Sequence, residues 1–175
     1  MFASPGLAEV NTNTIARAAG VGVGTFYAHF EDKFALYREL MANGLAMLQQ
    51  RLSEASQAAR DQPIEAQVRA TVAAFVDFAR SDPSLYRVVF AGGEGPGRAG
   101  RAGVGFSARA MENRLAELQQ AGQLAPAIDV AAAARFFNAG QSQLLLWWLD
   151  AADPPSPAGL IDTLVALHPA VVCRR

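Results

Sequence analysis

The sequence predicts an all-helical protein. Alanine, the strongest helix former, accounts for 36 of the 175 residues. The β-branched residues that favour strands are sparse, with 4 isoleucines and 5 threonines. Apolar side chains recur at helical intervals along much of the chain. Hydrophobic residues make up 51% of the chain and charged residues 18%, which is typical of a folded domain rather than of a disordered segment.

Two short helices are expected near the N-terminus. Asn11 is a suitable N-cap for a helix over 11–19, and Gly20 follows in the position of a helix-ending glycine. A second short helix is expected over 22–30. Two short helices that meet at a glycine turn form a helix-turn-helix, whose second helix enters the major groove of DNA. The apolar residues spaced to build their shared core are Ile15, Ala16, Ala19, Val21, Phe26 and Phe30.

Longer helices are expected after this unit. Asp32 suits the N-cap of a helix that continues through Leu52, and Pro63 suits the first turn of the next helix. The segment Ser81-Asp82-Pro83 ends that helix. Seven of the fifteen residues in 91–105 are glycine, which indicates a flexible loop. Further helices are expected over 84–90, 106–121, 129–150 with Asp129 as the N-cap, and 157–168.

The helix over 129–150 is apolar on two sides, whereas a surface helix needs only one apolar face. We therefore expect one side to pack on its own domain and the other on a second subunit. Adjacent residues point about 100° apart, so Trp147 and Trp148 serve different sides. One stripe consists of Phe136, Gly140, Gln143 and Trp147, and the other of Phe137, Gln141, Leu144 and Trp148.

The segment 11–33 resembles the signature of the tetracycline-repressor (TetR) family. In that family an I-A-x-x-A-G-V turn leads into G-T-[LF]-Y-x-[HY]-F and a capped lysine. The matching pieces, in order and spacing, are Ile15-Ala16, Ala19-Gly20-Val21, Gly24-Thr25-Phe26-Tyr27, His29-Phe30 and Asp32-Lys33. Phe2-Ala3 and Gly6 resemble the end of the family's first helix and the turn after it, so most of that helix is expected to be absent.

The resemblance implies an all-α fold with a DNA-binding head over 1–45 and a ligand-binding and dimerisation bundle over 46–175. It implies that operator DNA is contacted by Asn11, Thr12, Gly22, Val23, Gly24, Thr25, Tyr27, His29 and Lys33. His29 fits a packed side chain equally well. The charges of residues 1–60 sum to zero, so phosphate binding rests on few cations and on helix N-termini, which predicts a shallow salt dependence.

In the family the bundle binds a small-molecule effector and forms a homodimer through its last two helices. The dimer candidates here are Phe137, Gln141, Leu144, Trp148, Leu160 and Leu164. The ligand candidates are the bulky residues Phe75, Phe78, Tyr86, Phe90, Met111, Phe136 and Trp147, although ordinary core packing also accounts for each. Few polar groups lie among them, which favours an apolar or aromatic effector.

Other classes lack their sequence features. The net charge of −1 carries no basic excess, and the single cysteine, Cys173, forms no internal disulfide. The longest uncharged apolar stretch, 136–149, is shorter than the roughly 18 residues of a membrane span. No secretory signal is visible, so a cytoplasmic protein is expected.

An enzyme is not expected either. Gly95 to Gly100 match G-x-G-x-x-G, but a dinucleotide-binding fold also needs parallel strands. Only two histidines are present, His29 and His168, and no cluster has metal-ligand spacing, so neither metal nor cofactor is expected. We expect a homodimeric, ligand-responsive repressor. The alternative is a helical dimer that binds a ligand or partner but no DNA.

Overall fold

A computed structural model describes residues 10–91 and 99–173, with the side chains of 99–106 excepted. Every regular element in these ranges is an α-helix, which confirms the predicted fold class of a helix-turn-helix head and a helical bundle. The helices are α1 (Thr12–Ala18), α2 (Val23–His29), α3 (Lys33–Ala58), α4 (Ile64–Ser81), α5 (Pro83–Phe90), α6 (Ala99–Gln120), α7 (Val130–Asp150), α8 (Pro157–Ala166) and α9 (Pro169–Val172). Among the described residues, no helix is long and apolar enough to cross a membrane.

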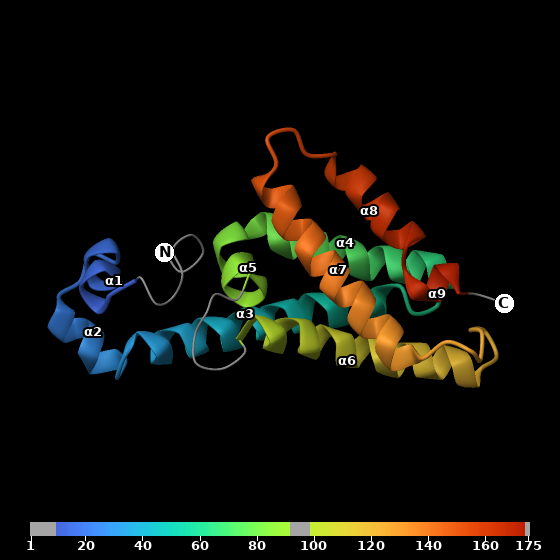
Figure 1. Ribbon diagram of the computed structural model, residues 1–175, viewed down its shortest axis with the longest axis horizontal. Helices are drawn as coiled ribbons and strands as arrows, with labels where there is room; N and C mark the ends of the chain where they lie inside the picture. The colour runs from blue at the N-terminus through green and yellow to red at the C-terminus, as the bar shows by residue number, and fades with distance from the viewer. Residues whose placement is uncertain (1–9, 92–98, 174–175) are drawn as a thin grey trace.

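The head lies at one end of an elongated molecule (Figure 1). It contains α1 and α2, and α3 runs from it into the bundle. The bundle packs around α4, which contacts α3, α5, α7, α8 and α9. On the opposite side α6 packs against α5 and α7.

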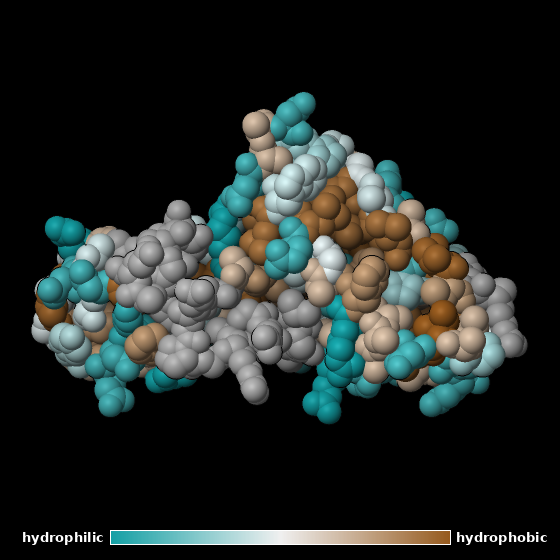
Figure 2. Space-filling model, in the orientation of Figure 1, coloured by the Kyte–Doolittle hydropathy of each residue, from teal (hydrophilic) through white to brown (hydrophobic). Residues whose placement is uncertain are grey.

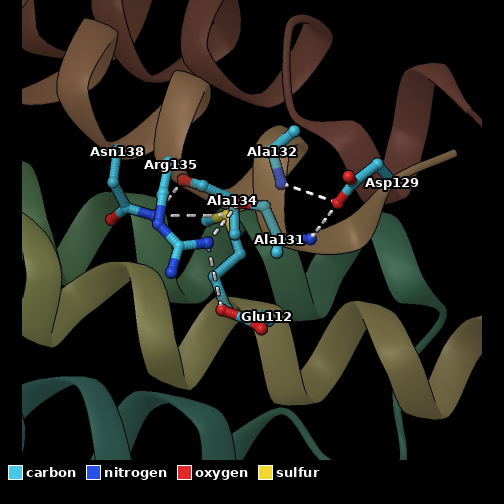
Figure 3. Close-up of polar contacts among 8 residues, drawn as sticks. Glu112, Asp129, Ala131, Ala132, Ala134, Arg135 and Asn138 are labelled. Carbon is cyan, nitrogen blue, oxygen red and sulfur yellow. Dashed lines mark hydrogen bonds and ion pairs between the residues drawn. The ribbon is translucent and has the colours of Figure 1, made fainter.

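The predicted helix starts agree closely with the structure because they depend on local capping. The Asn11 side chain accepts a hydrogen bond from the Thr14 amide (2.8 Å), and that of Asp32 accepts from the Ala35 amide (2.7 Å). Asp129 accepts from the amides of Ala131 and Ala132, at 3.0 Å each (Figure 3). Each carboxylate or amide oxygen satisfies backbone donors that a helix leaves unpaired in its first turn.

Glycine ends α1, as expected, and glycine also ends α6. Gly20 and Gly122 both have φ of +71°, a left-handed conformation that is costly for residues with a Cβ.

Two boundaries differ from the prediction. The helix expected from 106 begins at Ala99, so residues 99–105 of the predicted loop are helical. This segment is helical despite the low helix propensity of its glycines. The remaining loop residues, 92–98, lie outside the described residues, as do Phe2, Ala3 and Gly6. The last expected helix ends at Ala166, and a short α9 follows because Pro169 is suited to a first helical turn.

The head and the bundle have separate cores. Val10, Ile15, Ala16 and Phe26 are buried in the head, with Phe30 and Leu36 packed against them. Ala19 and Val21 were expected there but are exposed, because they lie at the outer side of the turn. The helix α3 contributes to both cores, since Leu36 packs in the head while Phe34 and Tyr37 pack in the bundle.

Buried tyrosine hydroxyls connect helices of the bundle. Tyr37 Oη donates to the Val88 carbonyl at 2.9 Å, which joins α3 to α5. Tyr86 Oη donates to the Ser142 carbonyl at 3.2 Å, which joins α5 to α7. Burial raises the pKa of both phenols, so they remain neutral donors at ordinary pH.

Candidate functional site

The second helix of the head presents its polar side to solvent. Phe26 is 5% exposed and holds α2 on the head core, whereas the neighbouring Tyr27 is 56% exposed. The Tyr27 ring packs edge-on against Phe26, with centroids 5.5 Å apart. Its hydroxyl makes no hydrogen bond to any residue that the structure describes. The other expected contact residues of this segment are also exposed: Gly22, Val23, Gly24, Thr25 and His29.

Two of the three remaining expected DNA contacts, Asn11 and Lys33, have structural partners. Asn11 Oδ1 accepts hydrogen bonds from the Thr14 amide and from Thr14 Oγ1, so its amide NH2 is the group left for an outside partner. Thr12 is half-buried in the first turn of α1. Lys33 Nζ donates to the Val10 carbonyl at 2.9 Å and lies 5.3 Å from the centre of the Phe34 ring. Lys33 therefore ties α3 to the segment before α1, a role that the sequence did not reveal.

A cavity of about 410 Å³ opens in the bundle. This volume lies within the range of about 300–1,000 Å³ that small-molecule sites have. The walls come from α3, α4 and α6, with α7 and the start of α9 at one end. Lining residues are Gln49, Leu52, Ser53, Ser56, Ile64, Gln67, Val68, Thr71, Val72, Phe75, Ser107, Ala110, Met111, Arg114, Leu115, Asn138, Gln141, His168 and Ala170.

Only two of the seven ligand candidates, Phe75 and Met111, line this cavity. Phe78, Tyr86 and Phe90 are buried in the aromatic core behind it, where the Tyr86 and Phe90 rings lie 4.7 Å apart. They pack the wall rather than form it.

The prediction was wrong for Phe136 and Trp147, which are 85% and 54% exposed and face away from the interior. The rotation of α7 about its axis, set by its packing on α6, turns this stripe outward.

The other stripe of α7 is correspondingly buried. Phe137, Gln141 and Trp148 are 6–7% exposed, and Leu144 is half-buried. Trp148 Nε1 donates to the Pro155 carbonyl at 2.8 Å, within its own chain. Leu160 and Leu164 of α8 are 2% exposed. The expectation that these residues face a second subunit is therefore corrected for all but Leu144, because the chain itself covers the other five.

Three buried polar side chains, Asn138, Gln141 and His168, line the cavity. Asn138 Nδ2 donates to the Ala134 carbonyl (2.9 Å) and to Met111 Sδ (3.4 Å), which fixes the amide (Figure 3). His168 Nδ1 accepts from the Ala170 amide at 3.1 Å. Burial lowers the pKa of His168 to about 4. Gln141 is the third of these side chains.

None of the three was predicted to line a ligand site. The available signal was the pair Asn138 and Gln141, two polar residues three positions apart on one face of a mainly apolar helix. Within the described residues, no group of three His, Cys, Asp or Glu side chains is placed to hold a metal ion.

The geometry defines the class of the protein. A helix-turn-helix head, joined by one long helix to a bundle with a ligand-sized cavity, is the architecture of a small transcriptional regulator. Residues 1–40 match the family described as "Bacterial regulatory proteins, tetR family". The head therefore matches that of the TetR family, and the whole chain shares its fold with solved TetR-family regulators.

Solved structures share the fold over nearly the whole chain. The fatty acid degradation regulator FadR from Bacillus halodurans has a TM-score of 0.74 at 16% identity, covering 99% of this chain and 94% of that one. FadR from Bacillus subtilis, solved in complex with stearoyl-CoA, gives 0.75 at 15% identity, covering 98% and 93%. The ketosteroid regulator KstR2 of Mycobacterium tuberculosis gives 0.71 at 17%, covering 99% and 89%.

Proposed function

We propose that the chain is a homodimeric repressor that leaves its operator DNA when a small, mainly apolar effector enters the cavity. The observation that carries this proposal is the course of α3. Its first turns complete the head, through Leu36, and its later turns line the cavity, through Gln49 and Leu52. One rigid element therefore belongs to both the proposed DNA-binding unit, 1–45, and the proposed ligand unit, 46–175.

The middle of α3 is held tightly against α5. Tyr37 Oη donates to the Val88 carbonyl, and a Cβ at Gly44 would lie 2.6 Å from Val89 Cγ2. An effector that displaces the cavity-lining part of α3 would therefore tilt the helix about this contact and move the head. Such a ligand acts only through its different affinity for the two head positions.

We assign the dimer interface to the outward stripe of α7, Phe136, Gly140, Gln143 and Trp147. Figure 2 shows hydrophobic residues gathered on the face that carries α7 and α8. Large exposed apolar residues such as Phe136 (85%) and Trp147 (54%) are typical of protein interfaces. A two-fold dimer also places two heads on DNA half-sites that lie about one helical turn apart.

The relatives support an apolar effector. Stearoyl-CoA is the molecule named with FadR from Bacillus subtilis, and a ketosteroid is named with KstR2. The cavity of this chain has a largely apolar wall that includes Val72, Phe75 and Leu115. A repressor of this kind acts in the cytoplasm, where its operator is.

Fluorescence anisotropy with labelled duplex DNA from upstream of the protein's own gene tests the proposal. Tyr27→Phe removes the hydroxyl but keeps the ring on Phe26, so affinity should fall about fivefold for one lost hydrogen bond, with the dimer unchanged. Met47→Ala, at an exposed site of α3 outside the head, is the control. A chain that dimerises and binds effector but not DNA would favour the alternative function, a ligand- or partner-binding dimer.

A further inference from the structure

Two buried side chains in the cavity wall, at what we call its inner end because they are the part of the wall away from solvent, have unused hydrogen-bonding groups. Gln141 is 6% exposed and His168 is 7% exposed, and both line the cavity. The Gln141 amide makes no hydrogen bond within the described part of the chain, and neither does His168 Nε2. No fully enclosed polar side-chain atom lacks a partner among the described residues, so these groups open onto the cavity.

The hydrogen bond at the other ring nitrogen fixes which proton His168 offers. Nδ1 accepts from the Ala170 amide, so in the neutral ring the proton is on Nε2, which is a donor. Burial lowers the pKa of His168 to about 4, so the ring is neutral near pH 7. The ring of Phe137 packs against it at 4.7 Å between centroids and holds its orientation.

The two groups belong to the same end of the cavity. Phe137, which contacts His168, and Gln141 are four residues apart on α7, so they lie one turn apart, about 6 Å, on one face. Asn138, on the same face of α7, has its NH2 group occupied by Ala134 and Met111. His168 and Gln141 are therefore two buried neutral donors that a bound molecule can meet.

Positive charge is confined to the rim. Arg114 is the only charged side chain that lines the cavity in the described ranges, and its side chain is 49% exposed. It is paired with Glu117 at 3.0 Å and with Gln67 Oε1 at 2.9 Å. A carboxylate at the inner end would be buried without a counterion, which is costly, whereas an uncharged oxygen would meet two donors.

We propose that His168 and Gln141 bind an uncharged carbonyl oxygen, so that the effector is a mainly apolar molecule with a ketone, ester, lactone or thioester group. This inference rests on the proposed function, because it takes the cavity to be the effector site. A hydrocarbon of the same shape would leave both donors unpaired, and a carboxylate would add a buried charge. Selectivity for the neutral carbonyl follows from these two costs.

Calorimetric titration of the full chain with three similar probes tests the inference. Benzylacetone carries a neutral carbonyl, butylbenzene carries no polar group, and hydrocinnamate carries a carboxylate. We expect benzylacetone to bind most tightly. Gln141→Leu and His168→Asn should each weaken its binding about fivefold to tenfold, the effect of one hydrogen bond, without weakening that of butylbenzene. Asparagine preserves the cap on α9 because its side chain also accepts from a backbone amide.

Controls keep the test decisive. Gln120→Leu makes the same change on an exposed turn of α6 and should leave all three affinities unchanged. Gln141→Met serves as a second variant if Gln141→Leu does not fold. Tighter binding of hydrocinnamate or butylbenzene, an unaltered benzylacetone affinity in the variants, or no binding of any probe would overturn the inference. DNA binding by the unliganded protein, measured in parallel, tests the proposed function separately.

Discussion

Lowering the pH from 7 to 5 should destabilise this protein through His168, the N-cap of α9. The ring is 7% exposed, and its burial lowers its pKa from 6.5 to about 4. Above pH 6.5 neither the folded nor the unfolded chain protonates this ring. Between pH 6.5 and 4 the unfolded chain binds a proton that the folded chain does not, so the free energy of unfolding falls as the pH is lowered.

The size of the effect follows from the pKa shift. Each unit is worth about 1.4 kcal/mol, so the full contribution of His168 is about 3 kcal/mol, lost by pH 4. About 2 kcal/mol of it is lost by pH 5. This is a large share of the roughly 5–15 kcal/mol by which domains are stable.

Urea denaturation followed by circular dichroism, at pH 7 and pH 5 and at one protein concentration, measures this loss. Carboxylates also titrate in this range, so the informative quantity is the difference between wild type and His168→Asn. The variant keeps an N-cap and should lose about 2 kcal/mol less on acidification. His29→Asn, at an exposed site, controls for the removal of a histidine. Equal losses in wild type and His168→Asn would refute the reasoning.

Three further substitutions test the packing. Gly44→Ala should lower the melting temperature, because the added Cβ would lie 2.6 Å from Cγ2 of buried Val89. This steric overlap outweighs the roughly 1 kcal/mol gained in helix propensity. A higher melting temperature would contradict the close contact of α3 with α5. Trp147→Glu should give a folded monomer in light scattering, and a dimeric Trp147→Glu protein would exclude the proposed interface. Trp148→Ala should instead lower the free energy of unfolding in urea by about 3–5 kcal/mol, because it removes a buried side chain. Asp129→Ala removes two hydrogen bonds that cap α7 and should lower the free energy of unfolding by about 1 kcal/mol in the same urea assay. An unchanged free energy of unfolding would show that this cap does not form in solution.

The helix α3, which belongs to both the head and the bundle, has a second anchor beyond its contact with α5. Arg51, further along α3 than the contact with α5, bonds Ser81 at 3.0 Å and lies over the Phe78 ring at 5.6 Å. The helix is therefore anchored to α4 on one side, while its cavity-lining residues, such as Leu52 and Ser53, face the space an effector would fill.

Much of the fold was predictable because its determinants are local. Asn11, Asp32 and Asp129 cap their helices through contacts two or three residues away. The head was recognisable for a related reason, since its motif lies within about 25 consecutive residues. The prediction of a loop over 99–105 was wrong because α6 already begins at Ala99, and the local glycine content did not reveal this start.

The sequence by itself determined that the chain is helical, where most helices begin, that α7 has two apolar sides, and which short motif forms the head. Only the tertiary structure decided which side of α7 faces inward, and it buried Trp148 and exposed Trp147, the reverse of the expected assignment. It also brought His168 to Gln141 at the end of the cavity. Helical periodicity groups residues into stripes but leaves the rotation of each helix undetermined, because that rotation depends on contacts with neighbours far away in the chain.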